Sequence, residues 1–275
     1  MGALDFSGYI FDLDGTIYRG EKLIRGARET IEKLKSLSKK IAYLSNKPIQ
    51  TREDYSAKLT RLGIPTKPEE VINSSLVMAR WLSHQAPGAA VFVIGEPPLI
   101  EEMRRAGFRI TDNPEEVQYV IASFDRSFDY RKLNIALQAI KRGAHFVATN
   151  PDRTCPVEGG EIPDCAAMIG AVEGATGKKV EAVVGKPSDT MIEVAVEAMG
   201  LRPQDCLLVG DRLETDVVMG KKGGMATALV LTGVTTLETL RRSSIQPDYV
   251  WESVAEMLKE ERGGKGPFGP VSQPG

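Results

Sequence analysis

The sequence has few residues of the two types that most often build soft-metal or nucleophilic centres. Its 275 residues include only three cysteines, Cys155, Cys165 and Cys206, and two histidines, His84 and His145. An odd number of cysteines without tight spacing argues against a disulfide framework and a cysteine zinc site, and it predicts a reducing, cytoplasmic location. Two histidines leave little room for a histidine-based triad or metal centre. Any bound metal should therefore be hard and oxygen-liganded, which favours Mg²⁺.

The chain also lacks long apolar runs and a large excess of charge of one sign. No apolar run reaches the roughly 18 residues that indicate a membrane span, and the first residues lack the charged-then-apolar layout of a signal peptide. The net charge is −2, with a pI near 5.9, so there is no basic footprint for a nucleic acid polymer. With 42% hydrophobic and 26% charged residues, we expect a soluble globular protein without membrane or nucleic acid partners.

Short β-prone apolar runs alternate with segments of helical period along the chain. The strand-like runs are residues 9–11, 41–44, 91–94, 119–122, 146–148, 182–184, 206–209, 226–231 and 249–250. Strands that alternate with helices predict an α/β fold built on parallel sheets.

Two Pro- or Gly-rich interruptions divide this pattern. Residues 85–88 and 174–177 combine turn formers with few apolar anchors, which is typical of hinges. The division predicts a core domain in two parts with an inserted α/β domain and a Gly/Pro-rich, disordered tail. The expected boundaries are 1–85 for the first part of the core, 86–179 for the insert, 180–262 for the second part and 263–275 for the tail.

The first strand runs directly into two aspartates. The apolar residues 9–11 end at Asp12, and Asp14, Gly15 and Thr16 follow. Ligands of open parallel sheets bind just beyond the carboxyl ends of the strands, and Gly15 permits a sharp turn there. Two carboxylates this close need a cation, a proton or solvent. A solvated turn after a strand would satisfy them as well as a metal site.

Three later strands also end on polar residues, at Ser45, Lys186 and Asp211. With Asp12, these residues are expected at one edge of one sheet. Taken singly, they are compatible with a plain turn, a surface lysine and an acidic helix start. The segment around Lys186 is not a P-loop, because Pro187 separates the lysine from Ser188.

Together these segments resemble the haloacid dehalogenase superfamily, in its NagD-like branch. The matching strings are DLDGT at 12–16, LSN at 44–46, ATNPD at 148–152, VVGKPS at 183–188, GDRLETD at 210–216 and LTGVT at 231–235. The resemblance extends to about Glu260. It implies a Rossmann-like parallel-sheet core with an inserted α/β cap of the C2 type. It also implies a Mg²⁺-dependent phosphomonoesterase acting on small phosphorylated metabolites, sugar phosphates above all, and on p-nitrophenyl phosphate.

The resemblance assigns roles to the residues of these strings. Asp12 is expected to attack phosphorus and form a phosphoaspartate, with Asp14 as the general acid and base. The phosphoryl group and substrate are expected to be bound by Thr16, Ser45, Asn46 and Lys186. The expected metal ligands are Asp12, the backbone carbonyl of Asp14, and Asp211, with Asp216 holding a metal-bound water.

In the same branch the cap supplies a specificity loop and often a homodimer interface. The loop here contains Asn150, Asp152 and Cys155. Cys155 stands where other members place a histidine or an aromatic residue, which disfavours pyridoxal phosphate as the substrate.

Four other readings stay open at this point. The first is a nucleotide or pyridoxal phosphate phosphatase of the same branch, and the second is a catalytically inactive binding homologue. The third is a phosphorylated receiver-like protein, although receivers are single small domains and lack a residue like Asp14. The fourth is a phosphomutase or phosphonatase, which would carry a helical cap soon after Thr16, where this chain has little room.

Overall fold

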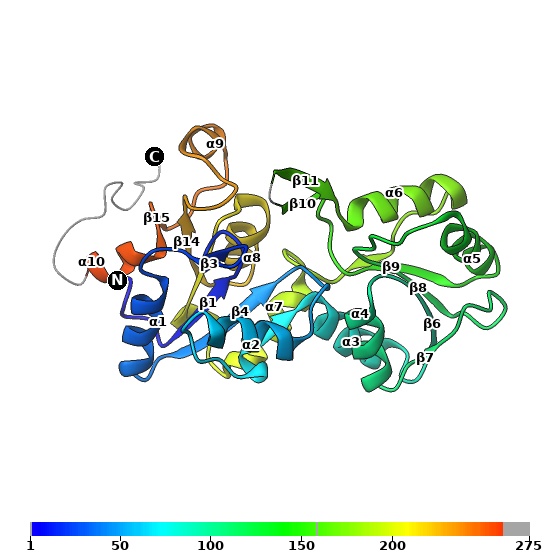
Figure 1. Cartoon of the computed structure of the whole chain (residues 1–275), viewed down its shortest axis with the longest axis horizontal. Helices are drawn as coiled ribbons and strands as arrows, with labels where there is room; N and C mark the ends of the chain where they lie inside the picture. Colours follow the sequence, from blue (N-terminus) through cyan, green and yellow to red (C-terminus); the bar gives the residue numbers. More distant parts are fainter. Residues whose placement is uncertain (1, 158, 261–275) are drawn as a thin grey trace. The chain divides into compact units, whose positions relative to one another are not determined.

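Figure 1 shows a computed structural model of the chain, in which residues 2–157 and 159–260 are described. The tail predicted at 263–275 lies outside these residues. The chain forms two compact units: the first comprises Met1–Ser45, Glu53–Ile72 and Ile192–Gly275, and the second Asn46–Arg52 and Asn73–Met191. Each unit contains a parallel sheet with helices, as the alternating pattern predicted.

The first unit is built on a six-stranded sheet. Its strand order is β15 (Tyr249–Trp251), β14 (Ala226–Val230), β13 (Cys206–Gly210), β1 (Gly8–Asp12), β4 (Lys40–Ser45) and β5 (Val71–Asn73). All pairings given for β1, β4, β13, β14 and β15 are parallel. Every residue of β1 and β13 is buried, as expected for strands with helices on both faces of their sheet.

The second unit contains a five-stranded parallel sheet. Its order is β12 (Ala182–Val183), β9 (His145–Ala148), β8 (Tyr119–Ala122), β6 (Ala90–Ile94) and β7 (Arg109–Ile110). The prediction that the strand before Lys186 belongs to the same sheet as β1 is wrong, since β12 pairs with β9. The apolar run Ala182–Val184 predicts a strand, but its pattern does not indicate with which strand it pairs.

The units also divide at residues other than the expected ones. Helix α3 (Ser74–Gln85) and strand β12 belong to the second unit, although the pattern placed both in the core. The hinges at 85–88 and 174–177 coincide with the ends of α3 and of α6 (Cys165–Thr176). Turn formers mark ends of elements, and only packing decides to which unit an element belongs.

Two hairpins were not predicted. One joins β2 (Tyr18–Arg19) to β3 (Lys22–Leu23), directly after the Asp12–Thr16 turn. The other joins β10 (Thr154–Val157) to β11 (Gly160–Pro163), where the sequence suggested only a loop. Gly159 adopts a positive φ of 85° between the two strands, a conformation that glycine favours in tight hairpin turns.

Helices flank both sheets (Figure 1). In the first unit they are α1 (Ala27–Ser36), α8 (Val218–Lys222), α9 (Leu237–Arg242) and α10 (Met257–Glu260), with the short turns η1 (Pro68–Glu70), η2 (Pro203–Asp205), η3 (Leu213–Val217) and η4 (Val254–Glu256). In the second unit they are α3, α4 (Pro97–Arg105), α5 (Tyr130–Lys141) and α6. Helices α2 (Arg52–Arg61) and α7 (Asp189–Met199) contain two of the four points at which the chain passes from one unit to the other.

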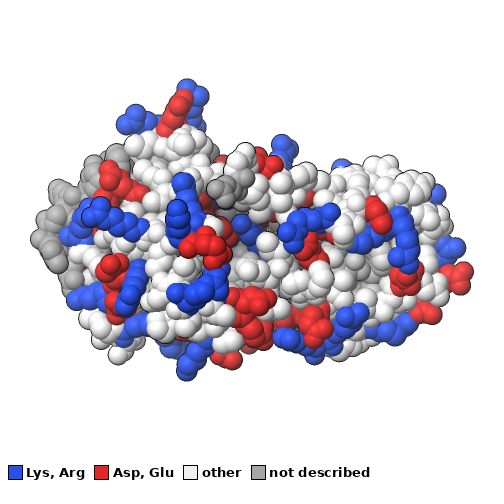
Figure 2. Space-filling model, in the orientation of Figure 1, with Lys and Arg blue, Asp and Glu red and all other residues white. Residues whose placement is uncertain are grey.

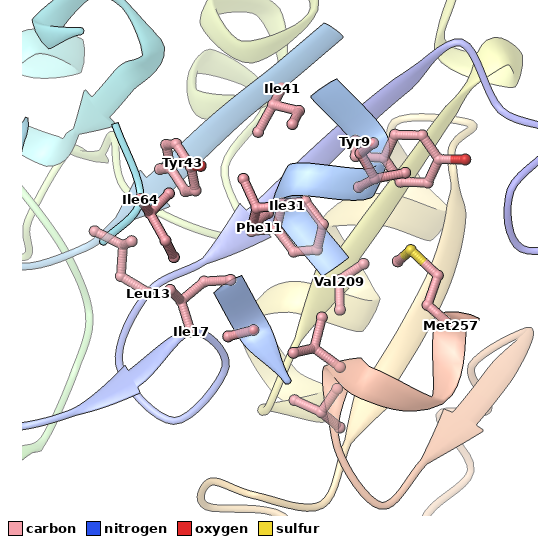
Figure 3. Close-up of a cluster of buried hydrophobic side chains, with 14 of the residues drawn as sticks. Tyr9, Phe11, Leu13, Ile17, Ile31, Ile41, Tyr43, Ile64, Val209 and Met257 are labelled. Atoms are coloured by element: carbon pink, nitrogen blue, oxygen red, sulfur yellow. The ribbon is translucent and has the colours of Figure 1, made fainter. Parts of the chain in front are cut away.

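The core of the first unit anchors the strands whose ends carry the predicted site. Phe11 of β1 packs with Tyr43 of β4, Val209 of β13 and Ile31 of α1 in one buried cluster (Figure 3). Fully burying an apolar side chain of this size stabilises the fold by about 1.5–3 kcal/mol. Each strand end is therefore held by the packing of the residues just before it.

Acidic and basic side chains are interspersed over the face shown in Figure 2. None of the helices in the described part of the chain combines the length and the apolar character that crossing a bilayer requires.

Candidate active site

Three of the four predicted strand-end residues lie at neighbouring positions of one sheet. Strand β1 lies between β13 and β4, with Phe11 opposite Val209 and Asp12 opposite Leu44. Asp12 ends β1, Ser45 ends β4 and Asp211 follows β13. These three placements agree with the sequence prediction, whereas Lys186 follows β12 of the other sheet.

The turn after β1 is held by the Leu13 carbonyl. It accepts hydrogen bonds from the backbone N–H groups of Ile17 and Tyr18 at 2.9 and 3.2 Å. Gly15 has φ of 90°, and a Cβ there would lie 2.7 Å from Asp211 Oδ2. Glycine is thus needed for both its conformation and its small size. The buried hydroxyl of Thr16 donates to Asp12 Oδ2 at 3.4 Å, so Thr16 orients Asp12.

Three buried carboxylates converge beside this turn. Asp12, Asp211 and Asp216 are 8%, 2% and 1% exposed, and one oxygen of each lies within 4.8 Å of the others. Two oxygens on opposite sides of one Mg²⁺ are roughly 4 Å apart, given bonds of about 2.0–2.1 Å. Three carboxylates this close and this buried repel one another unless a cation or bound protons reduce their negative charge. The all-oxygen donor set therefore fits a hard divalent metal.

Asp211 is held by the loop after β14, which sequence reasoning did not assign to the site. The N–H of Val234 donates to Asp211 Oδ2 at 2.7 Å, and the N–H of Thr235 donates to its carbonyl at 3.1 Å. A Cβ on Gly233 would overlap Asp211. The signal in the sequence was the glycine of LTGVT shortly beyond the end of a strand, where close backbone approach is common.

Asp216 is positioned by a π-helical turn and a second glycine. It lies in η3, and its Oδ2 accepts the Arg212 N–H at 3.1 Å. A Cβ on Gly210 would overlap the Asp216 side chain. Single π turns often occur at functional sites, and this one brings Asp216 back over the end of β13.

Ser45 and Asp14 have aromatic neighbours that the sequence did not suggest. Ser45 Oγ lies 3.3 Å from the hydroxyl of Tyr55. Burial, followed by the negative charge of Asp14, raises the pKa of Tyr18 well above its ordinary value. Lys58 Nζ lies 3.8 Å from the centre of the Tyr18 ring. A neutral Tyr18 with a cation over its ring thus lies close to Asp14.

In the second unit, Lys186 is part of a hydrogen-bonded network. Its N–H donates to Asn46 Oδ1 at 2.7 Å. Asn46 Nδ2 donates to the Lys186 carbonyl at 3.3 Å and to Asp152 Oδ2 at 3.0 Å. The network continues from Asp152, because its Oδ2 also accepts from Asn150 Nδ2 at 3.0 Å. The structure therefore brings together Lys186 and three residues predicted to bind substrate.

The network is anchored inside the second unit. Asn150 Nδ2 also donates to Asp164 Oδ1 at 3.1 Å, and Asp164 is the N-cap of α6. Burial raises the pKa of Asp164 above its ordinary value, against the lowering effect of the hydrogen bonds from Cys165 N–H and Asn150. Cys155, the remaining predicted residue, lies in β10 and is 4% exposed.

Sequence models of known families match two segments of the chain. The Haloacid dehalogenase-like hydrolase family matches residues 9–109, and a HAD-hydrolase-like family matches residues 183–257. The chain is 42% identical over 253 residues to the sugar-phosphatase AraL of Bacillus subtilis strain 168, covering 92% of each protein. It is 36% identical over 255 residues to an acid sugar phosphatase of Staphylococcus aureus, covering 93% of this chain and 98% of that protein.

Solved structures agree with these matches. A p-nitrophenyl phosphatase from Archaeoglobus fulgidus superposes with a TM-score of 0.88 at 38% identity, covering 93% of this chain and 99% of that one. NagD from Escherichia coli K-12 superposes with a TM-score of 0.84 at 31% identity, covering 93% and 98%. With the carboxylates at the ends of β1 and β13, these matches show that the chain belongs to the haloacid dehalogenase-like hydrolases and is a phosphatase of that family.

Proposed function

We propose that the protein is a Mg²⁺-dependent phosphomonoesterase that hydrolyses small phosphorylated metabolites, with sugar phosphates as the main class. The main support for this proposal is the group of three buried carboxylates, Asp12, Asp211 and Asp216, beside Ser45 at the edge of one sheet. Two relatives named as sugar phosphatases, each matched over more than nine-tenths of its length, support the substrate class.

In the proposed reaction Asp12 is the nucleophile. A carboxylate is ionised at neutral pH and needs no base to activate it. One oxygen of Asp12 bonds to phosphorus while the bond to the leaving alcohol breaks, and Asp14 gives its proton to the departing oxygen. Water then attacks the phosphoaspartate, Asp14 takes a proton from it, and the bond between phosphorus and Asp12 breaks to release phosphate.

Repulsion between Asp12 and the substrate is the main barrier that the site must reduce. The phosphate monoester carries about two negative charges. Asp12, Asp211 and the Asp14 carbonyl would hold the Mg²⁺, with Asp216 holding a water of the ion, and the ion would supply positive charge there. As the sequence resemblance implies, Lys186 adds a further positive charge, and Ser45 donates a hydrogen bond to a phosphoryl oxygen.

Assays with p-nitrophenyl phosphate test the enzyme class and the mechanism. Wild-type protein should release p-nitrophenol with Mg²⁺ and not with EDTA. Asp12→Asn should lower kcat to below a few per cent of wild type while inorganic phosphate still binds, because the amide keeps the shape of the carboxylate without its nucleophilicity. More activity than this in the variant would indicate direct attack by water. No hydrolysis by wild type would favour an inactive binding homologue.

A substrate panel tests the proposed class. We expect kcat/KM for sugar phosphates to exceed the values for nucleotides and pyridoxal phosphate. A preference for nucleotides or pyridoxal phosphate would instead favour the alternative of a nucleotide or pyridoxal phosphate phosphatase of the same branch.

We also propose a cytoplasmic location, which the buried thiols fit. Light scattering tests the homodimer predicted for the cap.

A further inference from the structure

The side chain of Asn46 uses both ends of its amide within the second unit. Its Oδ1 accepts the N–H of Lys186 at 2.7 Å, and its Nδ2 donates to the Lys186 carbonyl at 3.3 Å. The same Nδ2 donates to Asp152 Oδ2 at 3.0 Å. Asn46 is 8% exposed and Lys186 is 3% exposed, so these hydrogen bonds are shielded from water and costly to lose.

The residue before Lys186 is shaped to this contact. A Cβ on Gly185 would lie 2.5 Å from the Thr149 carbonyl oxygen and 2.7 Å from Asn46 Oδ1. Side-chain Cβ atoms do not approach that closely, so any other residue would push Asn46 away from the Lys186 backbone. The close approach of Gly185 and the two hydrogen bonds between Asn46 and the Lys186 backbone together fix the backbone conformation at Lys186.

Asp152 is fixed from two sides. Its Oδ2 accepts from Asn46 and from Asn150, both at 3.0 Å. Asn150 is fully buried and also bonds to Asp164, the cap of α6. A carboxylate that accepts hydrogen bonds from two buried amides is held in one orientation. Such a fixed side chain fits a structural, positioning role better than direct contact with varied substrates.

We propose that Asn46 and Asp152 are positioning residues that set the backbone of Lys186, and that they act on catalysis through Lys186 alone. This rests on the proposed function, in which the Lys186 ammonium binds the phosphoryl group. It replaces the expectation that Asn46 binds phosphate and that Asp152 selects the substrate. Residues that orient a functional group typically contribute a factor of about 10–100.

A double-mutant cycle tests the proposal with p-nitrophenyl phosphate. N46A should lower kcat/KM by about 10- to 100-fold in wild type and by less than about threefold in a K186A background, because the residue it positions is then absent. The full loss in both backgrounds would show that Asn46 acts on the substrate directly and would overturn the proposal.

A second arm compares substrates. D152A should lower kcat/KM by the same factor for p-nitrophenyl phosphate and for each sugar phosphate, since the Lys186 ammonium meets the group they share. Factors that differ by more than about tenfold among substrates would identify Asp152 as a specificity residue. N46D alone places two carboxylates together and should lose activity. The exchanged pair N46D/D152N restores one amide and one carboxylate, so it should recover activity relative to N46D.

A third arm does not depend on activity. Hydrogen exchange of the Lys186 amide should become faster in N46A and stay unchanged in N73A. Asn73 is a matched control, because it is a buried asparagine of the same unit that bonds to Leu76 and Gln50 instead. Unchanged exchange in N46A would overturn the proposal. If wild type hydrolyses no phosphate ester, the proposed function fails, and the exchange result still decides whether Asn46 holds the Lys186 loop.

Discussion

Asp14 occupies the turn after β1, two residues beyond Asp12 and outside the group of three converging carboxylates. In the proposed mechanism the Asp14 side chain transfers protons, while its backbone takes part in the turn. We predict that Asp14→Asn lowers kcat much more for sugar phosphates than for p-nitrophenyl phosphate. An alcohol needs a proton to leave, whereas p-nitrophenolate departs without help. Steady-state rates on both substrates measure the difference.

Thr16→Val provides a control for this prediction, because the Thr16 hydroxyl donates to Asp12, which is the proposed nucleophile for both substrates. It should lower both rates by a similar factor. An Asp14→Asn variant with equal losses on both substrates would mean that Asp14 serves the metal or the turn instead of proton transfer.

Asp211 and Asp216 are equally buried but differ in their expected distance from the metal. We predict that Asp211→Ala raises the Mg²⁺ concentration for half-maximal activity by more than tenfold, and that Asp216→Ala raises it less, since it holds the metal through water. Ca²⁺ should inhibit, because it prefers more ligands and longer bonds. Full activity with Ca²⁺ would contradict the predicted octahedral site.

Mg²⁺ should also stabilise the fold. Neutralising three clustered carboxylates favours the folded state, so excess Mg²⁺ should raise the Tm of wild type. At the same Mg²⁺ concentration the rise should be smaller in Asp211→Ala, which provides a test of binding that does not require turnover.

At the scale of the elements, one side chain adds to the backbone pairing between the edge strand β15 and β14. Asp248, just before β15, accepts from Thr227 N–H and Oγ1 at 2.8 and 2.9 Å and pairs with Lys221 of α8. Partial burial raises the pKa of Asp248, but the hydrogen bonds from Lys221 and Thr227 outweigh it and the net pKa lies below the ordinary value.

The sign of the pH dependence follows from this lowered pKa. Stability from Asp248 is present above its unfolded pKa of about 3.9 and is lost as pH falls through the lower folded value. We predict that Asp248→Asn lowers the free energy of unfolding by about 1 kcal/mol at pH 7, and that the difference from wild type shrinks below about pH 4. Urea unfolding of both proteins at several pH values measures this difference in the free energy of unfolding.

Glu238→Gln is the matched control for this experiment. Glu238 pairs with Arg242 on α9, and its side chain is 74% exposed. Exposed pairs contribute little, so this variant should stay within about 0.5 kcal/mol of wild type at every pH. A constant difference between Asp248→Asn and wild type from pH 7 to pH 3 would contradict the ionic contribution.

For the whole molecule, we propose that the two units have different roles in catalysis. The first unit carries the carboxylate site and the second carries Lys186 with the β10–β11 hairpin. The carboxylates and Ser45 are proposed to meet only metal and phosphate, which all substrates share. We therefore propose that the second unit selects the alcohol, as expected for the segment at 86–179.

We predict that Cys155→His in β10 changes the ratio of kcat/KM between pyridoxal phosphate and sugar phosphates by about tenfold, since a ring can stack and hydrogen-bond where a thiol cannot. Because Cys155 is buried, Arg153→Ala is a useful second variant at an exposed position of the same loop. The substrate panel measures both. A uniform fall across the panel would assign the hairpin to stability.

The sequence by itself determined the α/β class, the strand ends at Asp12, Ser45 and Asp211, and the family. These features are local: an apolar run followed by a polar residue predicts a strand and its end wherever the strand pairs. Parallel strands then align their carboxyl ends without further information. The approach of Asp12 and Asp211 was predictable for this reason, and the proposal of a hard metal rests on it.

Only the tertiary structure decided which sheet β12 joins and what surrounds each functional group. Two strands of the same composition are equally good partners for a third, so pairing depends on the packing of distant segments. The contact between Asn46 and Lys186 joins residues 140 positions apart, and the N–H of Val234 meets Asp211 across a strand crossover. Such contacts leave no period in the sequence, because they depend on how the chain folds back on itself.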